Sequence, residues 1–403
     1  MHILLIHQAY TSLDEAGGTR HHEFAQALRA HGHNVTIIAS SVSYLTGDAQ
    51  RRNNWSETTT TPEGIMVIRT YTYAALHKSF VHRVLSFISF MVSSFMVGLA
   101  VKKVDLVWGT SPPIFQGITA WLLARLKNAR FLFEVRDLWP AFAIAVGVLK
   151  NPLLIRLSNW LERFLYRHAD KIIVNSPGFI NHVEARGGKH VRLIPNGADP
   201  DMFDPDSTGT SFRLEHQLEG KFVVLYAGAH GMSNDLEVVL RAGRLLLPHT
   251  NIAIVLLGSG KEKPHLMQLA DEWKLTNVKF LPPLPKNKMG EALAGADACI
   301  AILKPIELYK TTYPNKVFDY MAAGRPVILA IDGVIREVVE NAGAGVFVNP
   351  GDPQAMADAI ISLAHSPELA PKMGQAGREA ITKKYHRKLI AADFIDFIEG
   401  MQP

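Results

Sequence analysis

The sequence predicts an α/β protein with two doubly wound domains, and three observations lead to this fold class. Short apolar runs rich in Val and Ile alternate with helix-length amphipathic stretches almost from end to end, as in stacked βα units. The chain has 403 residues, more than one hydrophobic core usually holds. A stretch dense in Asn, Gly, Asp and Pro at residues 196–206 separates the two halves, as an interdomain linker would.

The predicted strands are divided between two Rossmann-like domains, each with a parallel sheet covered by helices on both faces. The first domain is expected over residues 1–200, with strands at residues 3–8, 35–40, 66–71, 106–110, 131–135, 171–175 and 192–195. The second is expected over residues 201–385, with strands at residues 222–227, 252–257, 278–281, 298–303, 327–331 and 346–348. Residues 386–403 are expected to form a helix that can cross back to the first domain.

Composition narrows the class of protein. Apolar residues make up 48% of the chain and charged residues 20%, as in an ordinary globular protein. The single cysteine, Cys299, allows neither a disulfide within the chain nor a cysteine-based metal site, which favours a reducing compartment such as the cytoplasm. The N-terminus shows no basic leader with a small-residue cleavage site, so no signal peptide is predicted.

Charge is distributed unevenly along the chain. Residues 1–200 contain 21 Lys and Arg against 13 Asp and Glu, whereas residues 201–403 contain 21 against 24. A basic first domain suggests an anionic partner such as phospholipid headgroups, a lipid pyrophosphate or a nucleic acid. The alternative is a chance asymmetry on a solvated surface.

Residues 84–101 form an uncharged, apolar stretch. Basic residues flank it on both sides: Lys78, Arg83, Lys102 and Lys103. It is long enough to span a bilayer, but the strand predicted at 106–110 must rejoin the sheet of the first strand, and four serines within the stretch also weaken a span. Two interpretations remain: a helix packed deep against the sheet, or a helix that also lies partly in a membrane interface.

Two short motifs of the first domain are candidate ligand sites. Gly17 and Gly18 precede a predicted helix, where glycine lets a backbone approach phosphate or sugar oxygens, although an ordinary tight loop explains the pair equally well. Charged residues follow the strand at 131–135, at a sheet edge where ligands gather. We take Arg136 and Asp137 as candidate catalytic residues, with a salt bridge at the sheet rim as the alternative.

The most specific motif lies in the second domain. Pro314 is placed to start a helix, so that Asn315 and Lys316 lie in its first turn, where N–H groups and a Lys charge can hold a diphosphate. Asp319 follows one turn later on the same face, within reach of a ribose diol. Gly324 ends the helix. A simple capped helix explains the Pro and the Gly but not this polar set.

Loops after neighbouring strands of the second domain are expected to complete a nucleotide-sized site. His230 and Gly231 lie in the loop after the first strand, and Lys261 lies in the loop after the second, as a candidate phosphate partner. Leu284, which follows the third strand, is also a candidate for donor binding.

These residues resemble the retaining glycosyltransferases of family 4, which have the GT-B fold of two Rossmann-like domains facing across a cleft. The run Pro-Asn-Lys-Val-Phe-Asp-Tyr-Met-Ala-Ala-Gly-Arg-Pro-Val-Ile, from Pro314, is similar to the family's donor-site motif. The run Arg-Asp-Leu-Trp-Pro, from Arg136, is similar to a WbuB-like branch that makes bacterial O-antigen and capsule sugars. The resemblance covers nearly the whole chain.

The resemblance assigns roles by position. Asp319 falls at the family's ribose-binding glutamate, and Gly17 and Gly18 fall in the loop that faces the donor diphosphate. Asp137 is expected to orient the acceptor hydroxyl or take its proton, with Arg136 holding it in place or meeting an acceptor phosphate.

Several positions depart from the family pattern. Thr311 stands where the first motif glutamate is expected, with Glu307 nearby as a replacement, and Arg136 stands where many members have a histidine. Ala229 and Asp235 occupy the positions of the family's Arg and Lys. The diphosphate charge is therefore expected to be neutralised by Lys316, with support from Lys261 or His230.

The resemblance implies transfer, with retention, of an N-acetylhexosamine or a deoxy-N-acetylhexosamine from a nucleoside diphosphate, UDP being favoured. The implied acceptor is an oligosaccharide on a polyprenyl pyrophosphate, for bacterial surface polysaccharide. We expect a cytoplasmic protein attached peripherally to the anionic inner face of the cell membrane, with no nucleic acid partner. No Asp-x-Asp triplet lies among the donor-site candidates, so metal-independent transfer is expected. The alternatives are a UDP-N-acetylhexosamine 2-epimerase and a non-catalytic GT-B binding subunit.

Overall fold

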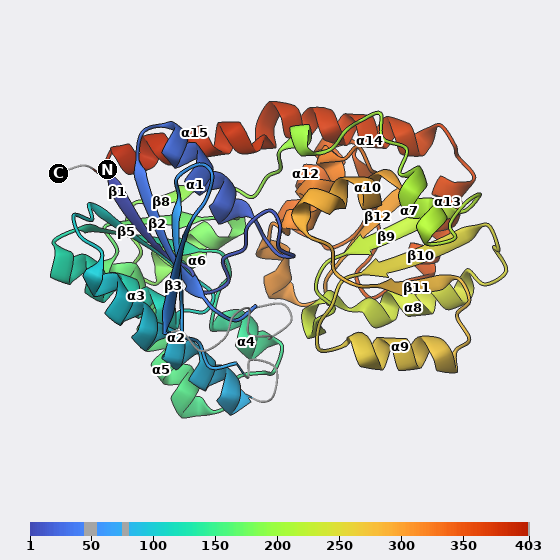
Figure 1. Cartoon of the computed structure of the whole chain (residues 1–403). Helices are drawn as coiled ribbons and strands as arrows, with labels where there is room; N and C mark the ends of the chain where they lie inside the picture. The colour runs from blue at the N-terminus through green and yellow to red at the C-terminus, as the bar shows by residue number, and fades with distance from the viewer. Residues whose placement is uncertain (44–54, 75–79, 402–403) are drawn as a thin grey trace. The chain divides into compact units, whose positions relative to one another are not determined.

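The computed structural model describes residues 1–43, 55–74 and 80–401, and its contacts divide the chain into two compact units. Unit 1 comprises Met1–Ser12, Gly18–Pro195 and Ile390–Pro403. Unit 2 comprises Leu13–Gly17 and Asn196–Leu389. Each unit is a largely parallel sheet covered by helices, which confirms the predicted class of two Rossmann-like domains (Figure 1).

The sheet of unit 1 has eight strands in the order β3-β4-β2-β1-β5-β6-β7-β8. The strands are β1 His2–Ile6, β2 Asn34–Ser40, β3 Ser56–Thr60, β4 Met66–Thr70, β5 Leu106–Ser111, β6 Arg130–Val135, β7 Lys171–Val174 and β8 Val191–Leu193. All neighbours are parallel except β3, which pairs antiparallel with β4 at the sheet edge. Strand β3 was not predicted, because its sequence Ser-Glu-Thr-Thr-Thr is polar and mostly exposed and so carries no apolar signal.

Helices cover both faces of this sheet. The helices are α1 Arg20–Ala30, α2 Phe80–Ala100, α3 Phe115–Lys127, α4 Ala141–Ala145, α5 Pro152–His168, α6 Ile180–Ala185 and α15 Arg387–Glu399. On one face, Phe24 of α1 stacks on Phe394 of α15 at 5.0 Å between ring centres, and both rings contact Trp108 of β5. On the other face, α3 packs beside α2 and beside α5 (Figure 1).

The sheet of unit 2 has six parallel strands in the order β11-β10-β9-β12-β13-β14. They are β9 Phe222–Ala227, β10 Ile252–Leu257, β11 Val278–Leu281, β12 Ala298–Ile302, β13 Val327–Ala330 and β14 Gly345–Phe347. The helices are α7 Thr210–Glu215, α8 Leu236–Leu245, α9 Lys263–Glu272, α10 Met289–Ala294, α11 Asn315–Ala322, α12 Val334–Ala342, α13 Pro353–Ala364 and α14 Leu369–Ala380. Every predicted strand of both units is present, with its ends within two residues of those expected.

Candidate functional site

The loops after β9 and β10 pack backbone against backbone at the carboxyl end of the unit 2 sheet. Gly258 and Gly260 have φ angles of +148° and +155°, and a Cβ atom added to either would lie 1.9 Å from the carbonyl oxygen of Gly228 or 2.5 Å from that of His230. Both positions therefore require glycine. Lys263 fixes the loops by donating to the carbonyl oxygen of Gly258 at 2.7 Å and to that of the last residue of β11 at 2.8 Å.

Lys316, in the first turn of α11, brings a buried ammonium group to these loops. Its Nζ atom lies 3.8 Å from the centre of the Tyr226 ring, at the end of β9. Within the described residues, this Nζ atom has no hydrogen-bond partner and no access to solvent. Burial lowers the pKa of Lys316 to about 7. A buried ammonium group without a partner is costly, and an anionic ligand would relieve that cost.

His230 is a second buried polar side chain in the same place. It is fully buried, and neither ring nitrogen has a hydrogen-bond partner within the part of the chain that the structure describes. Burial, and then the charges of Lys263 and Lys316, lower its pKa to about 4, so the ring is neutral near pH 7. A neutral imidazole still offers one N–H donor. Lys316 and His230 together can therefore bind an anion, and the half-buried Gly231 adjoins them.

Asp319 lies one turn along α11, partly exposed, and its carboxylate is bound by Lys286 at 2.5 Å. Lys286 belongs to a short 3₁₀ helix at Lys286–Lys288 that follows β11. Lys286 was not among the predicted site residues, although its place just after a strand was the available signal. The partly buried Leu284 of the same loop packs against the core of unit 2.

Three other predicted residues of unit 2 are placed differently. Asn315 is exposed at the start of α11, and Lys261 is exposed with no described partner. The lysine that meets the loops is Lys263, two residues later. Glu307 is 85% exposed and pairs with Lys310 at 2.9 Å, so it forms a surface ion pair.

The linker also holds acidic triplets that bear on the expectation of metal-independent transfer. Two Asp-x-Asp triplets occur there, at residues 199–201 and 204–206. Asp199 and Asp201 lie with His386 in a group that could hold a metal ion. However, the Asp201 carboxylate already pairs with Lys388 at 2.5 Å, and Asp199 accepts the backbone N–H of Asp201.

In unit 1, the charged run after β6 divides into two parts. Glu134 is fully buried and binds two residues of α1, Arg20 at 3.0 Å and His21 at 2.6 Å. Burial alone would raise the pKa of Glu134, but the neighbouring His21 and Arg20 outweigh it and lower the pKa to about 2. Burial keeps His21 neutral near pH 7 by lowering its pKa to about 4. Glu134 is therefore an ionised core partner of Arg20, separate from the strand-tip cluster that was expected.

Arg136 and Asp137 remain at the strand tip, and both are half-buried. Arg136 donates to the carbonyl oxygen of Pro112 at 3.1 Å. Burial raises the pKa of Asp137 to about 7, although the nearby Arg136 pulls it down. A carboxylate that titrates near neutral pH can serve as a general acid or base. Gly17 and Gly18 are exposed, and a Cβ atom added to Gly18 would meet nothing within 4 Å.

Helix α2 turns its polar residues inward. Ser86, Ser93 and Ser94 are buried, and Ser93 donates to the carbonyl oxygen of Tyr71 at 2.6 Å. Large aliphatic residues on the opposite side are exposed: Val81, Leu85, Ile88, Val92, Met96 and Leu99. This is the reverse of a water-facing helix. The buried serines therefore do not reduce the apolar character of the outer side.

Among the described residues, Val81–Ala100 is the one helix long and apolar enough to cross a membrane, and 28% of its apolar window is buried. The strands before and after it, β4 and β5, belong to the same sheet, and Ile3 of β1 lies opposite Leu106 of β5. This pairing excludes a crossing, as predicted. The flanking Lys78 lies outside the described residues.

Comparisons with known proteins show similarity in sequence and in fold. Residues 16–197 match the family described as "Glycosyl transferase 4-like domain", and residues 221–366 match "Glycosyl transferases group 1". A D-inositol 3-phosphate glycosyltransferase of Corynebacterium jeikeium is 28% identical over 298 residues, which cover 67% of this chain and 69% of the relative. Sucrose-phosphate synthase of Thermosynechococcus elongatus has a TM-score of 0.77 at 19% identity, over 99% of this chain and 98% of that one. Anabaena HepE, solved in complex with UDP-glucose, has a TM-score of 0.73 at 14% identity, over 99% of this chain and 100% of that one.

Proposed function

We propose a donor sugar for this chain, which belongs to the family 4 glycosyltransferases and uses a nucleotide-sugar donor. The proposed donor is a UDP-N-acetylhexosamine or its deoxy form. The sugar would pass with retention to an oligosaccharide on a polyprenyl pyrophosphate, in bacterial surface polysaccharide synthesis. The observation that carries the donor part of the proposal, a nucleoside diphosphate, is the buried, unpartnered Lys316 at the start of α11. The UDP-glucose complex of HepE, which shares the fold, favours UDP as the nucleotide.

The donor side of the reaction follows from charge. As the sugar leaves, negative charge grows on the diphosphate, and fixed positive charge at that oxygen lowers the barrier. Lys316, the N–H groups that begin α11 and the imidazole N–H of His230 supply that charge and those donors. Asp319, which forms a salt bridge with Lys286, would accept hydrogen bonds from the ribose hydroxyls. Lys316 would meet the diphosphate charge that a divalent cation meets in other transferases, so we propose metal-independent transfer.

On the acceptor side, Asp137 would orient the acceptor hydroxyl or take its proton late in transfer, and Arg136 would hold an acceptor phosphate. Burial makes the charge of Asp137 unfavourable in the folded protein. Asp137→Asn should therefore slow transfer while leaving the melting temperature unchanged or slightly higher. A variant that melts earlier and turns over normally would reduce Asp137 to a structural residue.

The outer side of α2 supports a lipid-linked acceptor. A polyprenyl chain cannot leave the bilayer, so the enzyme must bind at the membrane surface. The exposed aliphatic row from Val81 to Leu99, with its inward serines, fits a helix lying in the interface. We propose a cytoplasmic enzyme attached peripherally to the inner face of the cell membrane.

One assay tests the reaction. The protein is incubated with a panel of UDP-sugars, first alone and then with a polyprenyl-pyrophosphate-linked acceptor, while UDP release and sugar identity are followed. We expect release of UDP that depends on the acceptor and on an N-acetylhexosamine donor. An epimer formed without acceptor would instead favour the 2-epimerase alternative. Binding of UDP-sugar with no turnover under either condition would favour a non-catalytic subunit.

A further inference from the structure

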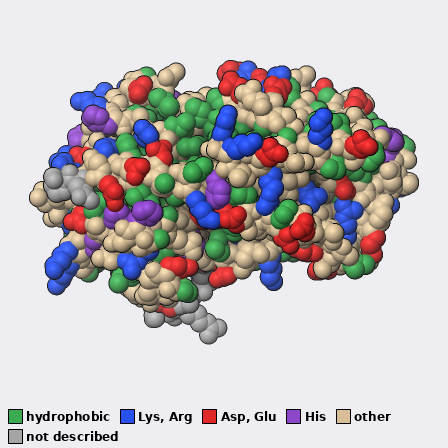
Figure 2. All heavy atoms as spheres, turned by 90° about the horizontal axis from the view of Figure 1, so that it is seen from above, with side chains coloured by type: hydrophobic (Ala, Val, Ile, Leu, Met, Phe, Trp, Pro, Cys, Tyr) green, Lys and Arg blue, Asp and Glu red, His purple; other side chains and the backbone are tan. Residues whose placement is uncertain are grey.

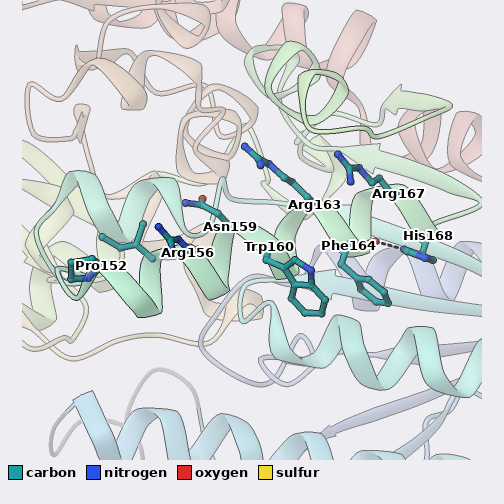
Figure 3. Close-up of a pocket in the computed structure, with 9 residues that line it drawn as sticks. Pro152, Arg156, Asn159, Trp160, Arg163, Phe164, Arg167 and His168 are labelled. Atoms are coloured by element: carbon teal, nitrogen blue, oxygen red, sulfur yellow. Dashed lines mark hydrogen bonds between the residues drawn. The ribbon is translucent and has the colours of Figure 1, made fainter.

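Helix α5 carries a row of three arginines on one side. Arg156, Arg163 and Arg167 are exposed and recur at intervals of seven and four residues, which places them on one face over about 16 Å. Figure 3 labels the three arginines along the helix, and within the described residues none of them forms a salt bridge. The helix has one acidic residue, Glu162, which is fully buried and bound by His182 at 2.7 Å. The exposed charges of α5 are therefore all positive.

Aromatic and aliphatic side chains lie beside these arginines. Trp160 is 62% exposed and stacks on Phe164, with 5.4 Å between the ring centres. Phe164 in turn contacts Trp121 of α3 at 4.8 Å. In Figure 3 the rings of Trp160 and Phe164 point away from the guanidinium groups of Arg163 and Arg167, and all four side chains line one open groove along α5. Tryptophan beside arginine and exposed leucine is the composition of a membrane interface, where the ring lies at headgroup level.

The same charge pattern extends over the neighbouring helices. Helices α2 and α3 contain no Asp or Glu, so the three helices on this face of unit 1 present no exposed carboxylate among the described residues. Helix α3 adds two basic residues, Arg125 and Lys127, and the exposed Leu126. By contrast, acidic and basic side chains are interspersed on the α15 side that Figure 2 shows.

We propose that α5 is a second membrane contact, at which Arg156, Arg163 and Arg167 bind the phosphate groups of anionic phospholipids and Trp160 enters the headgroup region. This inference rests on the proposed function, in which α2 already lies in the interface. A single helix in the interface leaves unit 1 free to roll about the helix axis. A second contact from α5 fixes that rotation, and with it the height of the carboxyl ends of the sheet above the bilayer.

The choice of a lipid surface over a nucleic acid follows from the apolar neighbours. A basic row alone would suit any polyanion. However, nucleic-acid interfaces are polar, whereas this row adjoins the exposed aliphatic residues of α5: Leu153, Leu154 and Leu157. Basic residues near anionic headgroups act together with such apolar burial to hold a protein at a bilayer.

Vesicle binding by the full chain tests the inference. Vesicles of phosphatidylcholine with and without phosphatidylglycerol are mixed with the wild-type protein, with R156Q/R163Q/R167Q, and with the control K274Q/K372Q/K384Q. The control removes the same charge from exposed lysines of unit 2. We expect the arginine variant to lose about 100-fold in partitioning onto phosphatidylglycerol vesicles at low salt, and the control to lose less than threefold. Equal losses in the two variants would overturn the inference.

Two further arms separate the outcomes. Trp160→Phe should abolish part of the blue shift in fluorescence that wild-type protein shows on vesicles, which a merely structural role for α5 would not predict. Val92→Glu, on the outer side of α2, should weaken binding even to neutral vesicles. Absence of wild-type binding to any vesicle would refute the membrane part of the proposed function. Wild-type binding that the arginine variant keeps in full would refute only the role of α5. Arginine-dependent binding to heparin without binding to any vesicle would refute both membrane contacts and favour a polyanion other than lipid.

Discussion

Glu134 and Lys316 are both ionisable groups buried at the carboxyl end of a sheet, one in each unit. They differ in their hydrogen-bond partners and in the protonation state that their surroundings favour. Glu134 has two partners from α1, and its pKa falls to about 2. Lys316 has an aromatic ring beside it but no acceptor among the described residues, and its pKa falls to about 7. One group is held in its charged form, and the other is pushed towards its neutral form.

The difference teaches how to separate structural charges from binding charges. A buried ion whose partners come from the fold serves the fold, and Arg20 extends this role by also donating to the carbonyl oxygens of Ile194 and Pro195. A buried ion without partners lowers the stability of the free protein, and a ligand of opposite charge removes this penalty by pairing with it. Mutating the first should therefore change stability, and mutating the second should change binding and rate.

The largest effect is expected at Glu134. Glu134→Ala leaves Arg20 buried without its carboxylate, so the free energy of unfolding should fall by about 3–5 kcal/mol, measured by urea denaturation. This contribution is present above pH 4.5, the usual pKa of a glutamate, and is lost as the pH falls towards 2. Glu134→Gln keeps a hydrogen bond and should lose less. If the Ala variant is as stable as the wild type, the structural role assigned to Glu134 is wrong.

The next effect is expected at Lys316. Lys316→Ala should cost about 2–4 kcal/mol of transition-state stabilisation, measured as kcat/KM for sugar transfer. Its stability should stay equal or rise, since an unpaired buried charge is removed. Lys316→Arg should restore activity only in part. A loss of activity below threefold would remove Lys316 from the diphosphate site.

A smaller effect is expected at Asp319. Asp319→Asn keeps one acceptor for the ribose but loses the charge, so UDP should bind about tenfold more weakly in isothermal titration calorimetry. The exposed Asp358 of α13 offers a matched control, because Asp358→Asn removes the same charge on the same unit. If both variants bind UDP as tightly as wild type, the ribose role is wrong.

The last prediction concerns protons. Between pH 7 and 10.5, Lys316 in the free enzyme is largely neutral, whereas a bound diphosphate favours its charged form. UDP binding at pH 8 should therefore take up close to one proton, seen by titration in buffers of different ionisation enthalpy. The same linkage makes stability of the free protein rise with pH in this window, because the unfolded chain binds the extra proton. Proton uptake that persists in Lys316→Ala would assign it elsewhere.

The sequence predicted the strands and the strand-end positions of several site residues, because both depend on local patterns. His230 and Asp137 lie where glycine-bearing or charged runs follow apolar strands, and Lys316 lies in the first turn of the helix that follows Pro314. Partnerships between distant residues left no local pattern. Arg20 reaches Glu134 across 114 positions, so the pairing became visible only in the folded unit.

The side that each helix turns to the sheet likewise could not be predicted from local sequence patterns. The apolar row and the serines of α2 are both visible on a helical wheel, but the wheel does not say which side meets the sheet. The structure places Phe90 and Ser93 inside and Val92 outside. Lys263 and Lys261 illustrate the same limit, since two residues of loop decide which lysine reaches the carbonyl oxygens.

Unit 1 is built from segments that lie on both sides of unit 2 in the sequence, and this sets the order in which the two units can fold during synthesis. Phe394 and Ile398 are fully buried in the core formed by β1, β5 and α1, at the end of the chain. A ribosome makes this helix after unit 2, so unit 1, which begins first, cannot close its core until unit 2 has been synthesised. Most of unit 2, from Asn196 to Leu389, is synthesised before that point. All the segments needed to fold unit 2 are therefore available before the core of unit 1 is complete.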